Sequence, residues 1–312
     1  MIKNISIIPS TFKIDFVKLR HISFSIVASI IVASTLSILS KGFNFGIDFK
    51  GGYLLEVRFN KDAPDVTDLR EKLNTLKLGE IMIQQAGSPQ DFLIKIENQE
   101  GKKSAEEIDV IATVKQSIGE NADYRKVEKI GPKVGQELVN NAITAIALAL
   151  IAMLIYIAVR FEWQFAICAI AALAHDCIAI LGFFSIFSLE FNETAIIAIL
   201  ITAGYSINDT IVIFDRIRET MKRFTRMDIS EVINTSLNET LSRTFLTAFT
   251  TLIAIVSLLI FGGEVISKFS LPIAIGILIG SFSSIFVASP LLKYLNLKIH
   301  SNHNTQTPAN QI

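Results

Sequence analysis

Cysteine and histidine are scarce in this chain, and their placement excludes the chemistry that they most often support. Of 312 residues only two are cysteines, Cys168 and Cys177, and four are histidines. The two cysteines lie nine residues apart in one apolar stretch, so a helix would place them on opposite faces, and we expect neither a disulfide nor a metal pair. No further His or Cys cluster accompanies His175, which argues against a zinc site. A nucleophile with a neighbouring base and a cofactor motif are also absent, so we expect no enzyme and no cofactor.

Net charge is absent as well. The 29 Lys and Arg residues balance the 29 Asp and Glu residues, which gives no indication of a nucleic-acid partner. Hydrophobic residues make up 51% of the chain and gather in stretches long enough to cross a membrane at about 1.5 Å rise per residue. We therefore predict an α-helical polytopic membrane protein with six transmembrane helices, at residues 22–40, 142–159, 164–189, 194–214, 244–261 and 271–292.

Lysine and arginine are unevenly distributed among the segments that flank these helices. Residues 1–21, 215–243 and 293–312 carry basic residues, whereas the turn at 188–193 holds two acids and no base. Because basic segments stay on the cytoplasmic side, we predict that the first three segments, and with them both termini, are cytoplasmic. The first helix follows a basic flank and precedes no cleavage site, which is typical of an uncleaved signal anchor.

The segment 41–141 is polar enough to form a separate domain. Its pattern predicts strands and helices in the order β-α-β-β-α-β, the ferredoxin-like arrangement. Ser104, with Glu107 three residues later, predicts the start of the second helix. The segment contains no Cys, no His and no glycine-rich phosphate loop, so a binding or lever role is a better interpretation than an active site. The predicted strands are 53–59, 80–85, 91–97 and 123–130, and the predicted helices are 65–76 and 104–118.

Asp209 is the only ionisable acid in the apolar run from Thr194 to Phe214. An aspartate at the centre of a membrane helix costs roughly 2.5–3.5 kcal/mol on translocon scales, so such a residue is a functional-site hypothesis once a partner is found. Arg243, which opens the next apolar run, is the partner that we propose. The two helices are predicted to be antiparallel neighbours, which places both residues near the same depth.

Polar side chains recur at helical spacing along these two helices. Facing stripes of this kind suit a proton relay in which a carboxylate titrates beside an arginine. A static buried ion pair that fixes helix packing would give the same pattern, and Arg243 would also suit an interfacial position with its charge in water. The stripes consist of Thr202, Tyr205, Ser206 and Asp209 on the first helix and of Arg243, Thr247, Thr250 and Thr251 on the second, with Asn208 as a further supporting polar residue.

His175 and Asp176 stand side by side near the middle of the third predicted helix. Two ionisable groups at that depth are costly. The pair therefore predicts either a second station of the relay or a hydrogen bond that joins helices.

Two glycine-containing segments connect the 41–141 domain to the membrane helices. The sequence GIDFKGG, with Asp48, Gly51 and Gly52, indicates a tight turn in which a structural role is expected. The sequence GPKVGQEL, with Gly131 and Pro132, indicates a helix breaker followed by a helix start. We interpret both as coupling segments, and the second as a hinge.

Five blocks occur along the chain in a specific order: GIDFKGG at 46–52, GPKVGQEL at 131–138, the pair at 175–176, GYSINDTIVIFDRIRE at 204–219 and LSRTFLTAFTT at 241–251. Together they resemble the SecD/SecF family of bacterial protein-export membrane proteins, within the RND superfamily, and its SecF-type members in particular. The resemblance covers residues 12–295.

The resemblance implies a subunit that pairs with SecD in the bacterial inner membrane and assists a late step of protein export through SecYEG, with YajC and YidC as further partners. It also implies that proton movement drives a periplasmic domain that acts on the translocating preprotein. Asp209 and Arg243 match the aspartate and arginine of the family's proton pathway. An RND-type small-molecule efflux component and a structural subunit without its own relay are the alternatives.

Overall fold

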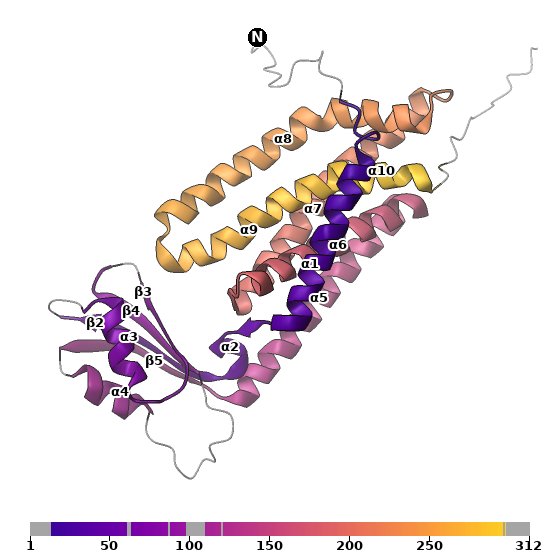
Figure 1. Cartoon of the computed structure of the whole chain (residues 1–312). Helices are drawn as coiled ribbons and strands as arrows, with labels where there is room; N and C mark the ends of the chain where they lie inside the picture. The colour runs from indigo at the N-terminus through magenta and orange to yellow at the C-terminus, as the bar shows by residue number, and fades with distance from the viewer. Residues whose placement is uncertain are drawn as a thin grey trace, which may run out of the picture.

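The computed structural model describes residues 14–60, 64–86, 88–97, 110–119, 121–295 and 297. Within these residues the chain forms a bundle of long helices and a smaller domain built on a β-sheet, which lies beyond one end of the bundle (Figure 1). The predicted helix start at Ser104 and Glu107, and the tail after residue 297, lie outside the described residues. We call the end of the bundle farther from the sheet the distal end.

Six helices in the described part of the chain are long and apolar enough to cross a membrane, as predicted. Each contains one of the predicted apolar stretches or most of it. They are α1 (Arg20–Lys41), α5 (Pro132–Arg160), α6 (Trp163–Ile186), α7 (Glu193–Arg223), α8 (Ile229–Phe261) and α9 (Gly263–Ser283). The sixth span continues without a break through η2 (Ser284–Ala288), α10 (Ser289–Leu291) and η3 (Leu292–Tyr294).

The helices extend beyond the apolar stretches at the distal end. Residues 215–243, predicted to connect the fourth and fifth membrane helices, are themselves mostly helical, because α7 continues to Arg223 and α8 already begins at Ile229. Asp228 caps α8 by accepting a hydrogen bond of 2.9 Å from the Ser230 N–H. Hydropathy marks where each helix is apolar, whereas capping marks where it begins.

Helix α7 packs against α6, α8 and α9, and a glycine allows one of these contacts to be close. A Cβ added to Gly280 of α9 would lie 2.8 Å from the Cβ of Ser206 in α7, so a larger residue would push the two helices apart. Helices α5 and α8 are far less enclosed, since 6% of the apolar window of each is buried, against 50% for α7. Their outer faces are therefore free to contact lipid or other proteins.

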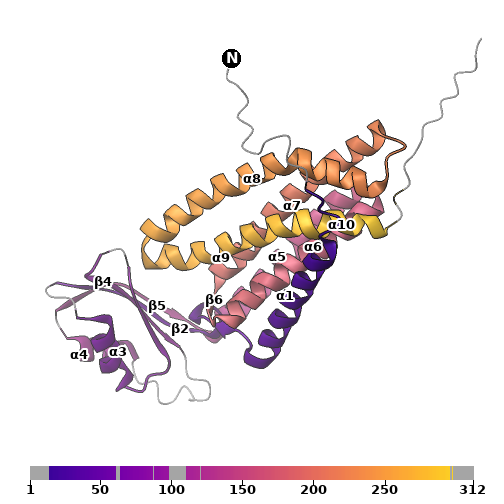
Figure 2. The ribbon, with the colours of Figure 1, turned by 45° about the horizontal axis from the view of Figure 1, so that its top comes forward.

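The described residues between 52 and 130 form a unit that we call the sheet domain. Its four strands make an antiparallel sheet in the order β3–β4–β2–β5. Two helices cover the face that is turned away from the bundle (Figure 2), and Leu69, Leu73 and Val114 are buried there against the sheet. The elements are β2 (Gly52–Phe59), α3 (Val66–Asn74), β3 (Ile81–Gln85), β4 (Asp91–Glu97), α4 (Val110–Ile118) and β5 (Ala122–Ile130).

The sheet domain meets the bundle at a compact joint. The joint consists of β1 (Asn44–Phe45), α2 (Ile47–Lys50), β6 (Glu190–Phe191) and the first turns of α5. Strands β1 and β6 pair in parallel, although they come from the ends of two different membrane helices. The joint thus links α1 to the loop before α7 as well as to the sheet domain.

Candidate functional site

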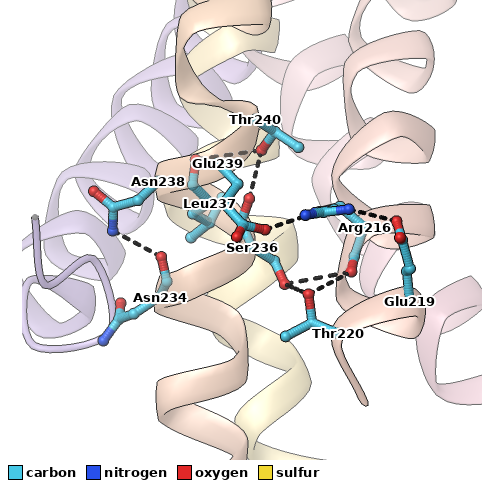
Figure 3. Close-up of polar contacts among 9 residues, drawn as sticks. All are labelled: Arg216, Glu219, Thr220, Asn234, Ser236, Leu237, Asn238, Glu239 and Thr240. Atoms are coloured by element: carbon cyan, nitrogen blue, oxygen red, sulfur yellow. Dashed lines mark hydrogen bonds and ion pairs between the residues drawn. The ribbon is translucent and has the colours of Figure 1, made fainter. Parts of the chain in front are cut away.

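Helices α7 and α8 are joined at the distal end by side-chain contacts. The Arg216 Nε of α7 lies 2.6 Å from a carboxylate oxygen of Glu239 in α8, and the Ser236 hydroxyl donates to the Thr220 hydroxyl at 2.9 Å (Figure 3). Because the helices are antiparallel, these two contacts fix the register between them. The register in turn places the more deeply buried residues of both helices.

The register shows which residues of α8 lie level with Asp209. Asp209 lies two turns before Arg216 on α7, and an equal rise along α8 from Glu239 leads to Leu246 and Thr247. Arg243 lies about one turn, or ~5 Å, nearer the distal end. The expectation that Asp209 and Arg243 share one depth is therefore met only to within a helical turn.

Asp209 is buried, with 2% of its surface exposed. Among the described residues, the Ser281 hydroxyl of α9 donates a long hydrogen bond of 3.5 Å to its carboxylate, and the Arg243 charge acts on it from a greater distance. Both Asp209 and Arg243 are described residues, and no ion pair joins them in this structure. Arg243 is exposed on the flank of α8, so the carboxylate lies in the bundle without a cation in contact.

His175 and Asp176 are buried in α6, with 2% and 0% of their surfaces exposed. The His175 Nδ1 lies 2.9 Å from one oxygen of the Asp176 carboxylate. The other oxygen accepts hydrogen bonds from Ser206 of α7 and from Ser283 of α9, the latter at 2.8 Å. The second ring nitrogen of His175 has no hydrogen-bond partner among the described residues. The pair thus joins three helices next to Asp209.

Ser283 and its neighbour Ser284 were not among the site residues predicted from the sequence. Ser284 begins the π-helical turn η2, and its hydroxyl donates to the Ser206 carbonyl at 3.1 Å and meets the Thr210 hydroxyl at 2.8 Å. Single π-turns within helices are frequent at functional sites. The cluster of three serines between 281 and 284, inside an otherwise apolar run, was the available signal.

The remaining polar residues of the two predicted stripes are not brought to Asp209. The hydroxyls of Thr247 and Thr251 donate to carbonyls of their own helix, at 2.9 Å to Thr244 and 2.8 Å to Thr247 respectively. Asn208 is exposed. Among the described residues, the hydrogen bond that Asp209 accepts therefore comes from Ser281 of α9 rather than from the threonines of α8.

The two predicted coupling segments lie against each other in the joint. Gly51 has a φ of +83°, a value that favours glycine, and a Cβ on Gly52 would run into the Ile96 carbonyl of β4. Gly131 caps α5, which begins at Pro132. Burial raises the pKa of the Asp48 carboxyl in α2, while the Lys95 charge opposes this shift. Gly51 is thus favoured by its backbone conformation and Gly52 by a close backbone approach, whereas a Cβ at Gly131 would meet nothing within 4 Å.

Comparison with known proteins gives consistent results. Residues 110–298 match the family model described as "Protein export membrane protein SecD/SecF, C-terminal", and residues 36–63 match that of the "SecD/SecF GG Motif". The chain is 41% identical to the protein translocase subunit SecF of Rickettsia prowazekii over 303 residues, which cover 96% of each chain. It is 42% identical to the corresponding protein of Rickettsia typhi over 288 residues, 91% of this chain and 92% of that one.

Two solved structures resemble the chain over most of its length. The crystal structure of SecDF from Thermus thermophilus, described as a translocon-associated membrane protein, matches 92% of this chain with a TM-score of 0.76 and 34% identity. SecDF in a super-membrane-facing form matches 91% with a TM-score of 0.67 and 34% identity. This chain spans 39% of the length of each SecDF chain.

Proposed function

The chain belongs to the SecD/SecF family of protein-export membrane proteins, and from this premise we propose that it couples proton movement through its membrane helices to movement of its sheet domain during protein translocation. The coupling residue is Asp209. Its burial at 2% exposure, without a contacting cation among the described residues, is the observation that carries the proposal.

Protonation decides which arrangement of α7 and α8 suits Asp209. A protonated carboxyl needs little more than the Ser281 hydroxyl beside it, whereas an ionised one requires a nearby positive charge. Arg243 is the cation that supplies this charge, and it lies about one helical turn away. Loss of the proton therefore draws Arg243 toward Asp209 and shifts α8 relative to α7, which requires the Arg216–Glu239 and Ser236–Thr220 contacts that set the present register to give way.

The energy available to this switch is sufficient. One elementary charge that crosses 100 mV is worth about 2.3 kcal/mol, which changes a two-state equilibrium roughly fiftyfold. Few protons per cycle are therefore needed. Asp176 and His175 support the switch, because they bind Ser206 and Ser283 and so hold α6, α7 and α9 together while α8 moves.

The joint carries the movement to the sheet domain. Support for this step comes from its connections: α1 leads into β1 and α2, α5 leads out of β5, and β6 immediately precedes α7. Asp48, Gly51, Gly52, Gly131 and Pro132 are the residues of the two coupling segments. A shift of any of these helices alters the position of the sheet domain.

The proposed setting is the bacterial inner membrane, with both termini in the cytoplasm and the sheet domain in the periplasm. The strand order β3–β4–β2–β5, with two helices on one face, supports a ferredoxin-like fold for that domain. The partners are SecD and SecYEG, with YajC and YidC in the same assembly, and the substrate is a translocating preprotein. The names of the relatives and the basic residues at the distal end of α7 support this setting.

The test is a comparison of two carboxylates on α7. In the Asp209→Asn variant, proton-gradient-dependent export is expected to fall at least tenfold, because asparagine cannot gain or lose a charge. The matched control is Asp215→Asn, since Asp215 is exposed and pairs with Arg160 at 2.8 Å. Full gradient-dependent export by the Asp209→Asn protein would refute the proposal.

Arg243→Ala separates the relay from a purely structural role. A relay predicts that this variant assembles with its partners at normal levels but exports poorly. Normal export by an assembled Arg243→Ala complex would favour the structural alternative.

A further inference from the structure

The residues just before α1 are bound to α8. Asn238 of α8 accepts a hydrogen bond from the Ile14 N–H at 2.9 Å, and its amide donates to the Ile14 carbonyl at 2.9 Å. One side chain thus satisfies both backbone groups of one residue, as a neighbouring strand would. Asn234, one turn earlier, accepts a hydrogen bond of 3.0 Å from the Val17 N–H.

A further contact and two buried side chains complete this arrangement. The Asn234 amide donates to the Asp15 carboxylate at 2.7 Å. The backbone N–H of Lys18 and then the Asn234 amide lower the pKa of Asp15, so this carboxylate is ionised and a strong acceptor at neutral pH. Phe16 and Val17, at 1% and 3% exposure, are buried in the main core of the bundle. We call Asn234 and Asn238, with residues 14–17, the asparagine clamp.

The clamp fixes the alignment of residues 14–17 along α8, and does more than attach them to it. The apolar contacts of Phe16 and Val17 hold the segment in the core, but they are not directional and specify its alignment with α8 less strictly than hydrogen bonds do. The three backbone hydrogen bonds of the two asparagines allow one alignment, because a shift by one residue leaves buried or partly buried polar groups unpaired. The segment therefore moves with α8 when α8 moves.

The opposite face of the same turns of α8 holds α7. In Figure 3, Ser236 and Glu239 point toward Arg216 and Thr220 of α7, whereas Asn234 and Asn238 point away from them. The beginning of α8 is thus bound on one side to the helix that carries Asp209 and on the other to the residues that lead into α1. Arg243 follows Asn238 within two turns on α8.

Helix α1 connects the clamp to the joint. It is continuous from Arg20 to Lys41 and is followed by β1, which pairs with β6 in the joint. It packs along α6, and Gly182 of α6 makes a close approach to Ser34 possible. A displacement at its first turn is therefore transmitted to its last.

We propose that Asn234 and Asn238 are positioning residues that couple α8 to α1, so that movement of α8 at Asp209 reaches the sheet domain along α1. This inference rests on the proposed function and adds a route to it. The direct route passes through the proximal ends of α5 and α7, whereas this one starts at the opposite end of the bundle. The clamp stays closed through the cycle, and α8 and α1 move together.

The experiment breaks the clamp in one variant and locks it in another. The Asn234→Ala/Asn238→Ala double variant removes the hydrogen bonds. The Asp15→Cys/Asn234→Cys variant is locked with a short, reducible bifunctional thiol reagent, with the unsubstituted chain treated in parallel because Cys168 and Cys177 are present. Export with and without a proton gradient, assembly and thermal unfolding are measured for the full complex. Glu231→Gln, at an exposed position of the same helix, is the matched control.

The broken clamp is expected to lose at least fivefold in gradient-dependent export while assembly stays normal and gradient-independent export is unchanged. The locked clamp is expected to export at least as well as the reduced form, because the cross-link replaces the Asn234 contacts that the cysteine substitutions remove. Normal gradient-dependent export by the double variant would overturn the inference. So would loss of export on locking that is restored by reduction, a result that stands even where the double variant does not fold.

Asp209→Asn, measured in parallel, keeps the two proposals apart. If Asp209→Asn abolishes gradient-dependent export while the broken clamp does not, only the clamp inference fails. If Asp209→Asn exports normally, the proposed function itself fails.

Discussion

Lys95 of β4 and Glu190 of β6 form an ion pair of 2.7 Å that joins the sheet domain to the proximal end of the bundle. Their side chains are 13% and 11% exposed, so water solvates either charge poorly. Removing one partner of such a pair costs more than an exposed salt bridge would, because the other charge is left without compensation. The contact between the sheet domain and the bundle is therefore sensitive to a single change of charge.

Charge reversal tests this contact. Each single variant, Lys95→Glu or Glu190→Lys, is expected to weaken docking of the sheet domain by about 1–3 kcal/mol, between the values for exposed and buried pairs. The double variant restores opposite charges and is expected to recover at least half of the loss. Spin-label distances between α3 and α9 would measure docking. A double variant no better than the worse single one would contradict this.

Gly135 makes a close backbone contact between the two coupling segments. A Cβ there would lie 2.5 Å from the Phe49 carbonyl oxygen of α2, and backbone atoms cannot move aside as a flexible side chain would. Gly135→Ala is expected to separate α2 from α5 and to increase protease cleavage at the joint severalfold. Gly131→Ala is the control, because a Cβ at Gly131 meets nothing within 4 Å. Equal cleavage of both variants would show that the contact is not restrictive.

Ser283 donates to a fully buried carboxyl group, and its hydroxyl is not easily replaced. Ser283→Ala leaves one acceptor of Asp176 with the Ser206 hydroxyl alone, and we expect the free energy of unfolding to fall by about 1–3 kcal/mol. Ser257→Ala, at an exposed serine that bonds only to the Ile253 carbonyl of its own helix, is expected to change it little. Thermal unfolding in detergent would compare them, and a Ser283→Ala protein as stable as Ser257→Ala would contradict the role.

The Asp91 carboxyl makes the stability of the sheet domain depend on pH. The Ser88 hydroxyl, followed by the Arg58 guanidinium, lowers the pKa of the Asp91 carboxyl. A carboxyl with a lowered folded-state pKa stabilises the fold above its unfolded pKa of about 3.9, and this contribution is lost as the pH falls toward the folded value. Asp91→Asn is therefore expected to destabilise the sheet at pH 6, and its difference from wild type is expected to shrink as the pH falls through the folded-state pKa of Asp91.

Hydrogen exchange of the β2 and β4 amides, corrected for the intrinsic rate at each pH, would follow this change. Asp68→Asn, at an exposed acid of α3, serves as the control. A difference between wild type and Asp91→Asn that persists unchanged down to the lowest pH would contradict the assignment.

The six membrane helices could be predicted because their signal is local. An apolar stretch of sufficient length by itself indicates a membrane helix. In strands such as Asp91–Glu97, the alternation of more and less buried residues indicates which face of the strand is buried. The ends of α7 and α8 could not be found in this way, since Arg216 and Glu239 lie in polar helix beyond the apolar stretch and are held by each other. Helix length there depends on a contact between two elements.

The candidate site was predictable in its acids but not in their partners. Asp209, His175 and Asp176 stand out because a charge in an apolar run is costly wherever it lies. Their donors depend on how α9 is rotated and on where its π-turn falls, and a serine in a membrane helix has no such cost to mark it. The relation of Asp209 to Arg243 likewise depends on a register that is set two turns away, at Arg216.

The asparagine clamp has a consequence for biosynthesis. Ile14 and Asn238 are 224 residues apart, so the beginning of the chain leaves the ribosome long before the residue that binds it exists. The joint likewise forms late, because Asn44 pairs with Glu190, which is synthesised long after it. The sheet domain can fold while both closures are still open. Synthesis of the first turns of α8 is then the event that allows the clamp to close, before α9 has been made.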